Sequence, residues 1–185
     1  TVRYARALTR GLQRARCGNM AQHFPAHGAT AVDSHHDVPV IEISKEELMR
    51  EHIPPYAATF AEGCTTICTA HLRCPALDPD PTSIATTSRP ILVDFLRGEL
   101  GYQGVTIADC VSMVAYQKMG DVTETTIDAV NAGCDSICIT LEDDTSEKIF
   151  TALLGAAHDG RLSEDRLNEA VMRNLSFKKW LGILA

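Results

Sequence analysis

Residues 63–68 read Gly-Cys-Thr-Thr-Ile-Cys, and residues 133–138 read Gly-Cys-Asp-Ser-Ile-Cys. Each segment follows a stretch with helical periodicity and opens an apolar run, which is typical of a buried strand. A third such run covers residues 105–108, and a weaker one covers residues 17–23. Because strands that are apolar on both faces alternate here with helices, the sequence predicts a parallel α/β sheet of about four strands.

Caps, prolines and glycines mark the helices between these strands. Ser44, Ser88 and Ser163 can each cap a helix amino terminus. Pro54 and Pro55 are expected to divide one helix into two pieces. Helices are predicted over residues 2–15, 45–62, 89–100, 123–132, 146–158 and 164–181, strands over 17–23, 64–70, 105–108 and 134–140, and loops over 73–87 and 110–122.

Length and composition describe an ordinary globular chain. Its 185 residues suffice for one domain with a real core, so we treat residues 1–185 as a single domain. The net charge of −7 argues against nucleic acid as the main partner, although residues 1–16 hold five arginines and no acid. No apolar run approaches the roughly 20 residues of a membrane helix, so no membrane partner is expected. Because the chain begins with Thr1 rather than Met, we expect it to be part of a longer protein.

The seven cysteines are an odd number, and several lie in predicted strands. Cys64, Cys68, Cys134 and Cys138 are expected to act there as small hydrophobic side chains. This usage favours a reducing, cytoplasmic setting. A zinc site built from the two Cys-x3-Cys pairs is an alternative, but no Cys-x2-Cys knuckle accompanies them.

Residues 21–39 concentrate ionisable side chains in a loop, because Pro25 and Gly28 oppose regular structure there. Loops of this kind on a rigid scaffold commonly carry chemistry. Asp33 and His35 are the first candidates, since a carboxylate beside an imidazole fixes its tautomer and suits it to general acid–base catalysis. The alternative is two polar loop residues without mutual contact. The histidines and aspartates of the loop are His23, His27, Asp33, His35, His36 and Asp37.

The ends of the predicted strands supply further candidates. In a parallel α/β barrel, catalytic groups project from the carboxyl ends of strands. Asp109 directly follows Val-Thr-Ile-Ala, and strand propensity does not explain an acid there. A turn or helix cap is the alternative for Asp109. His71 and Thr140 also stand at strand ends, and His71 is expected to line the pocket or to cap its strand.

A metal centre is an alternative to these assignments. The loop histidines and aspartates could assemble a zinc or iron site. His23 and His27 have the spacing of a helical zinc motif, but Pro25 excludes a helix between them. We therefore predict no metal. The loop residues that could bind such a metal are His23, His27, Asp33, His35 and Asp37.

Two segments resemble signatures of glycoside hydrolase family 3, in its β-N-acetylglucosaminidase branch. Residues 22–28, Gln-His-Phe-Pro-Ala-His-Gly, followed by Asp-Ser-His at 33–35 and Val-Pro at 38–39, are similar to the family's Lys-His-Phe-Pro-Gly-His-Gly, Asp-Ser-His and Leu-Pro. Residues 108–113, Ala-Asp-Cys-Val-Ser-Met, are similar to its Ser-Asp-Asp-Leu-Ser-Met. The departures are Gln22, Ala26, Ala108 and Cys110 in place of Lys, Gly, Ser and Asp.

The resemblance implies a fold and an activity. The chain would be the C-terminal half of a (β/α)8 catalytic barrel, from about the fifth strand onward. It would hydrolyse terminal β-linked N-acetylglucosamine with retention, with Asp109 as nucleophile and His35, supported by Asp33, as acid/base. The resemblance places Gln22 and His23 against sugar hydroxyls.

The resemblance gives His27 a role in shaping the loop of residues 21–39 (the signature loop) and requires no cofactor. A degenerate relative that binds carbohydrate without catalysis, or acts as a scaffold, is the alternative. Either form is expected to dimerise or to pair with a missing first half.

Overall fold

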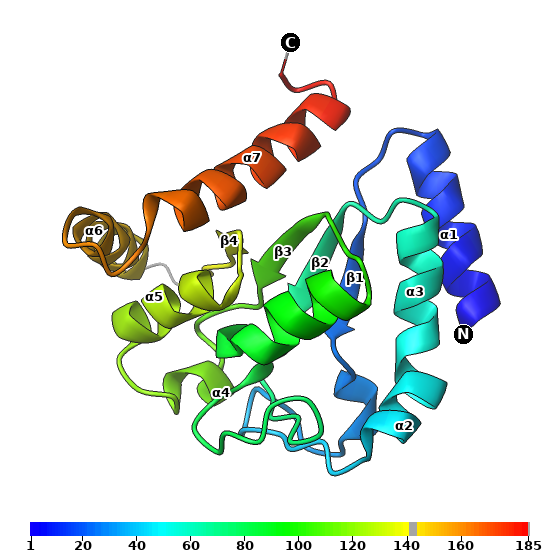
Figure 1. Cartoon of the computed structure of the whole chain (residues 1–185), viewed down its shortest axis with the longest axis horizontal. Coiled ribbons are helices and arrows are strands. Elements are labelled where there is room, and N and C mark those ends of the chain that lie inside the picture. The colour runs from blue at the N-terminus through cyan, green and yellow to red at the C-terminus, as the bar shows by residue number, and fades with distance from the viewer. Residues whose placement is uncertain (141–143, 185) are drawn as a thin grey trace.

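The computed structural model describes residues 1–140 and 144–184. Its centre is a parallel sheet in which successive strands lie side by side in the order β1-β2-β3-β4 (Figure 1). The strands are β1 (Met20–Phe24), β2 (Thr66–Thr69), β3 (Val105–Ala108) and β4 (Ser136–Ile137). This confirms the predicted α/β fold, and it is the arrangement found in half of a (β/α)8 barrel.

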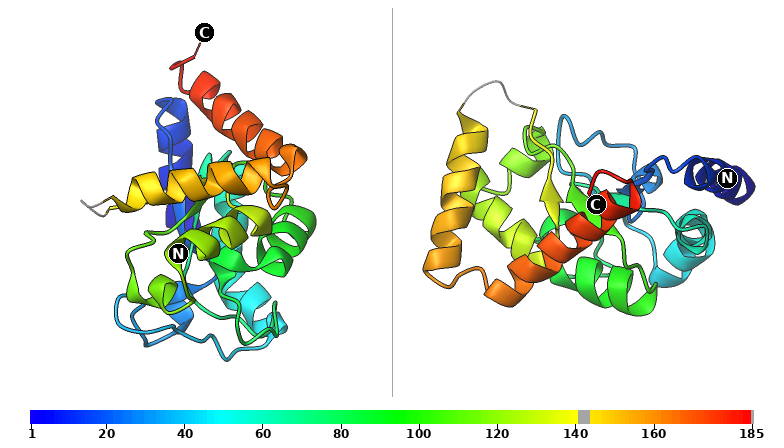
Figure 2. Two further views of the ribbon diagram at one scale, coloured as in Figure 1. Left: turned by 90° about the vertical axis from the view of Figure 1, so that its left-hand side faces the viewer. Right: turned by 90° about the horizontal axis from the view of Figure 1, so that it is seen from above.

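Helices connect the strands and surround the sheet. Figures 1 and 2 show α1 and α6 at opposite ends of the molecule, beyond the two edges of the sheet. Among the described residues, no helix combines the length and apolar character needed to span a bilayer. The helices are α1 (Val2–Arg14), η1 (His27–Ala29), α2 (Lys45–Glu47), η2 (Leu48–His52), α3 (Ile53–Ala61), η3 (Ala85–Thr87), η4 (Pro90–Glu99), α4 (Val114–Gln117), α5 (Val122–Ala132), α6 (Thr145–His158) and α7 (Glu164–Trp180).

Several helix ends lie where the sequence predicts them. The Ser44 hydroxyl accepts a hydrogen bond from the Glu47 N–H at 3.2 Å, and Ser163 caps α7 in the same way. Gly133 ends α5 with φ at 129°, where a side chain would be strained. A Cβ there would also come within 3.2 Å of Leu92 on η4, so the helix end depends on close packing as well.

Pro54 and Pro55 interrupt their helix without introducing a loop. The π-helical segment η2 precedes them, and both prolines lie in the first turn of α3. Since proline has no N–H to donate, a local change of hydrogen-bond pattern lets the chain remain helical through this point. The two predicted helix pieces are therefore a π-helical segment followed directly by an α-helix.

Two other segments differ from prediction. The strand expected over residues 134–140 is confined to β4, which pairs with β3 at one edge of the sheet. The loop expected over residues 110–122 contains the helical turn α4. The Ala115 N–H in this turn donates to the Ser34 carbonyl at 3.1 Å. A contact with a distant loop stabilises α4, which a local pattern does not reveal.

The main core lies between the sheet and the helices α3 and η4. Phe24 on β1 stacks on Phe95 of η4, with ring centroids 6.1 Å apart, and meets Tyr56 of α3 edge-on at 5.4 Å. Ile67 on β2 and Leu92 on η4 are fully buried in the same cluster. This packing fixes the strands, and with them the loops that follow their carboxyl ends.

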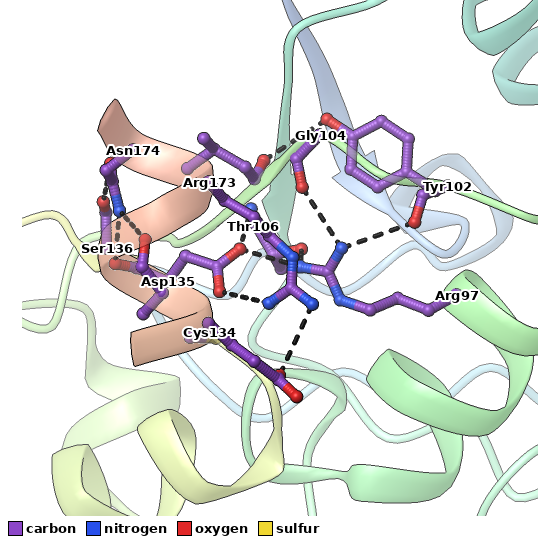
Figure 3. A network of polar contacts seen from close by, with 12 residues as sticks. Arg97, Tyr102, Gly104, Thr106, Cys134, Asp135, Ser136, Arg173 and Asn174 are labelled. Atoms are coloured by element: carbon purple, nitrogen blue, oxygen red, sulfur yellow. Dashed lines mark hydrogen bonds and ion pairs between the residues drawn. The ribbon is translucent and has the colours of Figure 1, made fainter. Parts of the chain in front are cut away.

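A buried ionic network ties α7 to the amino-terminal side of β4. The Asp135 carboxylate is 0% exposed and pairs with Arg97 at 2.7 Å and Arg173 at 3.0 Å (Figure 3). Arg166 approaches the same carboxylate at 2.7 Å, and the Thr106 N–H donates to it at 3.0 Å. The network thus joins η4, β3, β4 and α7.

Candidate active site

Asp109 follows β3 directly, at the carboxyl edge of the sheet. Its Oδ1 accepts a hydrogen bond from the Cys110 N–H at 2.8 Å, and its Oδ2 lies 3.5 Å from His23 Nε2. The side chain is 19% exposed. One carboxylate oxygen is therefore held by the backbone, and the other faces a histidine.

Asp109 shares a cavity of about 390 Å³ with the signature loop. The predicted acid/base pair and two further predicted site histidines line this cavity, on segments more than 70 residues before Asp109 in the chain. The predicted residues that line it are His23, His27, Asp33, His35 and Asp109.

Asp33 and His35 are in contact. The ring Nδ1 of His35 lies 2.7 Å from Asp33 Oδ1, which also accepts the His35 backbone N–H at 2.9 Å. The backbone and ring hydrogen bonds from His35 lower the pKa of Asp33 below its ordinary value. Since the ionised carboxylate binds the Nδ1 proton, Nε2 is the nitrogen that can exchange a proton with a ligand.

His23 and His27 line the same cavity as Asp109 and the Asp33–His35 pair. Their rings meet edge-on, with centroids 5.8 Å apart, and His27 Nε2 lies 3.0 Å from the hydroxyl of buried Ser34. Burial lowers the pKa of His23, and Asp109 opposes this shift without cancelling it. His23 is therefore mostly neutral near pH 7, with one ring nitrogen able to donate and the other able to accept.

Gln22 does not line this cavity. It is exposed and borders a separate hollow of about 860 Å³ beside β1 and α1, which His23 and His27 also reach. Gln22 and His23 both border that hollow, but of the two only His23 also lines the cavity of Asp109.

His71 has a different position from the one expected, since it is fully buried and does not reach the cavity. Its Nε2 lies 3.1 Å from the Cys110 carbonyl, so Nε2 carries a proton and donates. Its Nδ1 then accepts from the Thr86 hydroxyl at 2.8 Å. Burial lowers the pKa of His71 to about 4, which keeps the ring neutral. The expected substrate contact of His71 is therefore corrected: the ring supports the backbone of Cys110, the residue after Asp109.

Sequence reasoning missed a cluster beside Asp109. Cys110 Sγ lies 2.9 Å from the Ser112 hydroxyl and 2.8 Å from that of Thr140, which joins the ends of β3 and β4. Burial raises the pKa of the Cys110 thiol, but hydrogen bonds from Ser112 and Thr140 outweigh it and leave the pKa below its ordinary value. The signals in the sequence were Thr140 at a predicted strand end and the positions of Cys110 and Ser112 in the segment 108–113.

The histidines and aspartates of the loop do not gather into a metal site of their own. Asp37 Oδ1 instead accepts from Lys118 at 2.8 Å, and Asp33 is engaged with His35. All seven cysteines are free, and Cys138 is half-buried rather than part of the core. One group among the described residues does offer metal-binding geometry, namely His23, Cys68 and Asp109.

Comparisons with known proteins agree on one family. Residues 1–177 match the profile described as the glycosyl hydrolase family 3 N terminal domain. A beta-hexosaminidase of Nitrosomonas eutropha is 30% identical over 170 residues, which cover 90% of this chain and 48% of that protein. A beta-hexosaminidase of Aromatoleum aromaticum is 33% identical over 135 residues, which cover 73% of this chain and 37% of that protein.

A solved structure gives the same result. The glycoside hydrolase family 3 beta-N-acetylglucosaminidase from Paenibacillus sp. str. FPU-7 superposes with a TM-score of 0.93 and 37% identity. The match covers 97% of this chain and 34% of that one. The chain therefore spans about half or less of the length of these similar proteins.

Proposed function

Because the chain belongs to glycosyl hydrolase family 3, we propose that it carries the catalytic centre of a retaining β-N-acetylglucosaminidase. The observation that supports this most is the cavity that Asp109 shares with the Asp33–His35 pair. A nucleophilic carboxylate and a separate acid/base that line one pocket are what a double displacement requires. The similar proteins are beta-hexosaminidases and a beta-N-acetylglucosaminidase, so the proposed sugar is a terminal β-linked N-acetylhexosamine.

In the first step, Asp109 Oδ2 attacks the anomeric carbon and the bond to the leaving oxygen breaks. Protonated His35 gives its Nε2 proton to that oxygen, so the leaving group departs neutral. Asp33 holds Nδ1 at 2.7 Å and stabilises the imidazolium before it transfers the proton. In the second step, neutral His35 takes a proton from water, the hydroxide attacks the anomeric carbon, and Asp109 is released.

The remaining site residues position the substrate and the nucleophile. His23, neutral and 3.5 Å from Asp109, can donate a hydrogen bond to a sugar hydroxyl or to the carboxylate. His27 is hydrogen-bonded to the Ser34 hydroxyl and shapes the loop of residues 21–39. Gln22 can reach a hydroxyl only from the β1 side, where it brings no charge.

We also propose that a complete site needs further βα units. The strands β1 and β4 are the two edges of the sheet, and each lies beside a hollow, of about 860 Å³ at β1 and about 500 Å³ at β4. Unpaired strand edges favour pairing with another chain segment. A preceding half barrel or a second copy of this chain would cover both edges and close the pocket.

A family member that binds carbohydrate without turnover is the second candidate. The second acid of the family motif is Cys110 here, and its thiol is engaged with Ser112 and Thr140. A thiol in place of an acid changes the charge next to Asp109. This form would bind the amino sugar and release no product.

The test is release of a chromogenic aglycone from an N-acetyl-β-glucosaminide. We expect Asp109→Ala to lower turnover by roughly 10⁴-fold or more, the scale on which removal of a nucleophile acts. Asp94→Ala is the control, because Asp94 is an exposed acid on η4. Equal turnover by the Asp109 variant and the wild type would exclude the proposed nucleophile. Binding of N-acetylglucosamine by a wild-type chain that shows no turnover would favour the second candidate.

His35→Ala separates the acid role from the nucleophile role. Its turnover should fall much more for alkyl glycosides than for nitrophenyl glycosides, because a good leaving group needs little protonation. An equal loss for both substrates would contradict general acid catalysis by His35.

A further inference from the structure

Two free cysteines meet where the neighbouring strands β3 and β4 end. Cys110 lies two residues after β3, and Cys138 directly follows β4. We propose that they form a peroxide-reactive pair, in which Cys110 is oxidised by a hydroperoxide and Cys138 then closes a disulfide with it. The disulfide would displace the backbone beside Asp109 and slow turnover.

The hydrogen bonds between the two strand ends place Cys138 opposite both Asp109 and Cys110. The Cys138 N–H donates to the Ala108 carbonyl at 3.2 Å, and the Cys138 carbonyl accepts from the Val111 N–H at 3.1 Å. A regular parallel ladder leaves one residue between two such bonds, whereas two residues lie there in this chain. The extra residue is a bulge, which brings Cys110 to the edge of β4.

The spacing suits a disulfide. Neighbouring strands lie about 4.8 Å apart and advance about 3.3 Å per residue, so a residue opposite Cys138 or one step along is about 5 to 6 Å away. Disulfides join Cα atoms that are roughly 4.4 to 6.8 Å apart. The two side chains also interact: burial raises the pKa of Cys138, and so do the charges of Cys110 and Asp109 and a hydrogen bond with the Cys110 side chain.

The surroundings of the two thiols differ and assign their roles. The hydroxyls of Ser112 and Thr140 lie 2.9 Å and 2.8 Å from Cys110 Sγ, where they can stabilise a thiolate. Cys110 is half-buried, so a small reagent can reach its sulfur. The Cys138 thiol has its pKa raised instead and is the thiol that attacks second.

The chemistry needs one molecule of hydrogen peroxide for each disulfide. The Cys110 thiolate attacks one peroxide oxygen, the O–O bond breaks, and the products are a sulfenic acid and hydroxide. The Cys138 thiol gives its proton to hydroxide, and its sulfur attacks the Cys110 sulfur. The S–O bond then breaks and a second water leaves. The two thiols lose two electrons together, and the peroxide is reduced to two waters.

The effect of the disulfide on turnover rests on the proposed function. The Cys110 N–H holds Asp109 Oδ1 at 2.8 Å, and the Cys110 carbonyl lies 3.1 Å from His71 Nε2. Drawing Cys110 Sγ toward Cys138 moves this backbone, and a shift of about an ångström in a reacting group can cost about 10²-fold in rate. Disulfide formation itself needs only the two thiols, so it is measurable in a chain that has no turnover.

The experiment treats the full chain with hydrogen peroxide, alkylates the remaining thiols and maps tryptic peptides by mass spectrometry without reduction. Cys17 is exposed and is replaced by Ser throughout. Trypsin cuts after Lys and Arg, so Cys110 lies in the peptide 98–118 and Cys138 in the peptide 119–148. We expect peroxide to link these two peptides and dithiothreitol to separate them.

The matched control is Cys134→Ala, because Cys134 is the other cysteine of the peptide 119–148 but is fully buried. The link should persist in Cys134→Ala and disappear in Cys138→Ala. Cys110→Ala, at a half-buried position, is the second variant and should also lack the link. Circular dichroism checks that each variant folds. A folded parent chain without the link, or a link that requires Cys134 rather than Cys138, would overturn the proposed pair.

Aglycone release before and after peroxide treatment distinguishes the two proposals. A linked chain that has no turnover in its reduced form would support the thiol pair and count against the glycosidase. Turnover in a chain that forms no link would do the reverse. A roughly 10²-fold loss on oxidation that dithiothreitol restores, and that Cys110→Ala does not show, would support both. A link that leaves turnover unchanged would overturn the effect on Asp109.

Discussion

Asp109 and Asp135 lie at opposite ends of neighbouring strands and have opposite surroundings. Asp135 precedes β4, is fully buried, and pairs with Arg97, Arg166 and Arg173. Asp109 follows β3 and is 19% exposed; a backbone N–H holds one of its oxygens and His23 lies 3.5 Å from the other. One carboxylate is neutralised by fixed cations, and the other remains available to a ligand.

The different surroundings of the two acids follow from the ends of the strands at which they lie. The amino-terminal ends of the strands carry stability, and the carboxyl ends carry the loops where chemistry takes place. A nucleophile bound to guanidinium groups would be stabilised in its ground state and react slowly. A buried acid without such partners would cost several kcal/mol of desolvation. Each acid therefore has the surroundings that its role requires.

The same substitution at both acids tests this comparison. Asp135→Asn should lower the free energy of unfolding by about 3–5 kcal/mol, because it leaves buried arginines without their counter-charge. Urea denaturation measures this loss. Asp94→Asn, at an exposed acid, should stay within about 0.5 kcal/mol of the wild type. A loss below about 1 kcal/mol at Asp135 would show that the network contributes little.

The buried support behind Asp109 should produce a smaller, pH-dependent effect. Above about pH 6.5, His71 is neutral in both the folded and the unfolded chain. As the pH falls, the unfolded chain takes up a proton first, because the pKa of His71 in the folded chain is about 4. Stability should therefore fall between about pH 6.5 and 4, by up to about 3 kcal/mol.

His71→Gln should remove this part of the pH dependence, since glutamine keeps a donor and an acceptor but does not titrate. His36→Gln, at an exposed loop histidine, should leave it unchanged. Denaturation curves at pH 7 and pH 5 measure the difference. The same pH dependence in the His71 variant and the wild type would contradict the assignment of a buried neutral ring.

The smallest effect is expected from Asp109→Asn. The amide oxygen can still accept the Cys110 N–H, and no guanidinium loses a partner, so the free energy of unfolding should change by less than about 1 kcal/mol. Urea denaturation beside Asp135→Asn gives the direct contrast. A loss as large as that of Asp135→Asn would mean that Asp109 is chiefly structural.

Local sequence signals predicted most elements of this fold. The strand over residues 105–108 and the acid that follows it appear as predicted, because a short β-branched run and a polar stop involve only neighbouring residues. Ser44 and Ser163 cap helices as predicted for the same reason. The Asp33–His35 contact could also be predicted from the sequence, since the partners are only two positions apart in the chain.

Local sequence signals did not predict the contacts between segments that are distant in the chain. The Arg97–Asp135 pair spans 38 residues, and the bond from His71 to the Cys110 carbonyl spans 39. His71 looked like a pocket residue because it stands at a strand end, yet packing against Tyr116 and Thr86 keeps it buried. Its orientation depends on neighbours that periodicity does not identify.

Sequence patterns were sufficient for the alternation of strands and helices, for the family, and for the acids and histidines at the carboxyl ends of strands. The partners of those side chains depend on the register between strands, which sets Cys68 beside His23 and Asp109 and surrounds Asp135 with arginines. The physical reason is range, because propensities and caps act over a few residues, whereas burial and charge pairing act between any segments that the fold brings into contact.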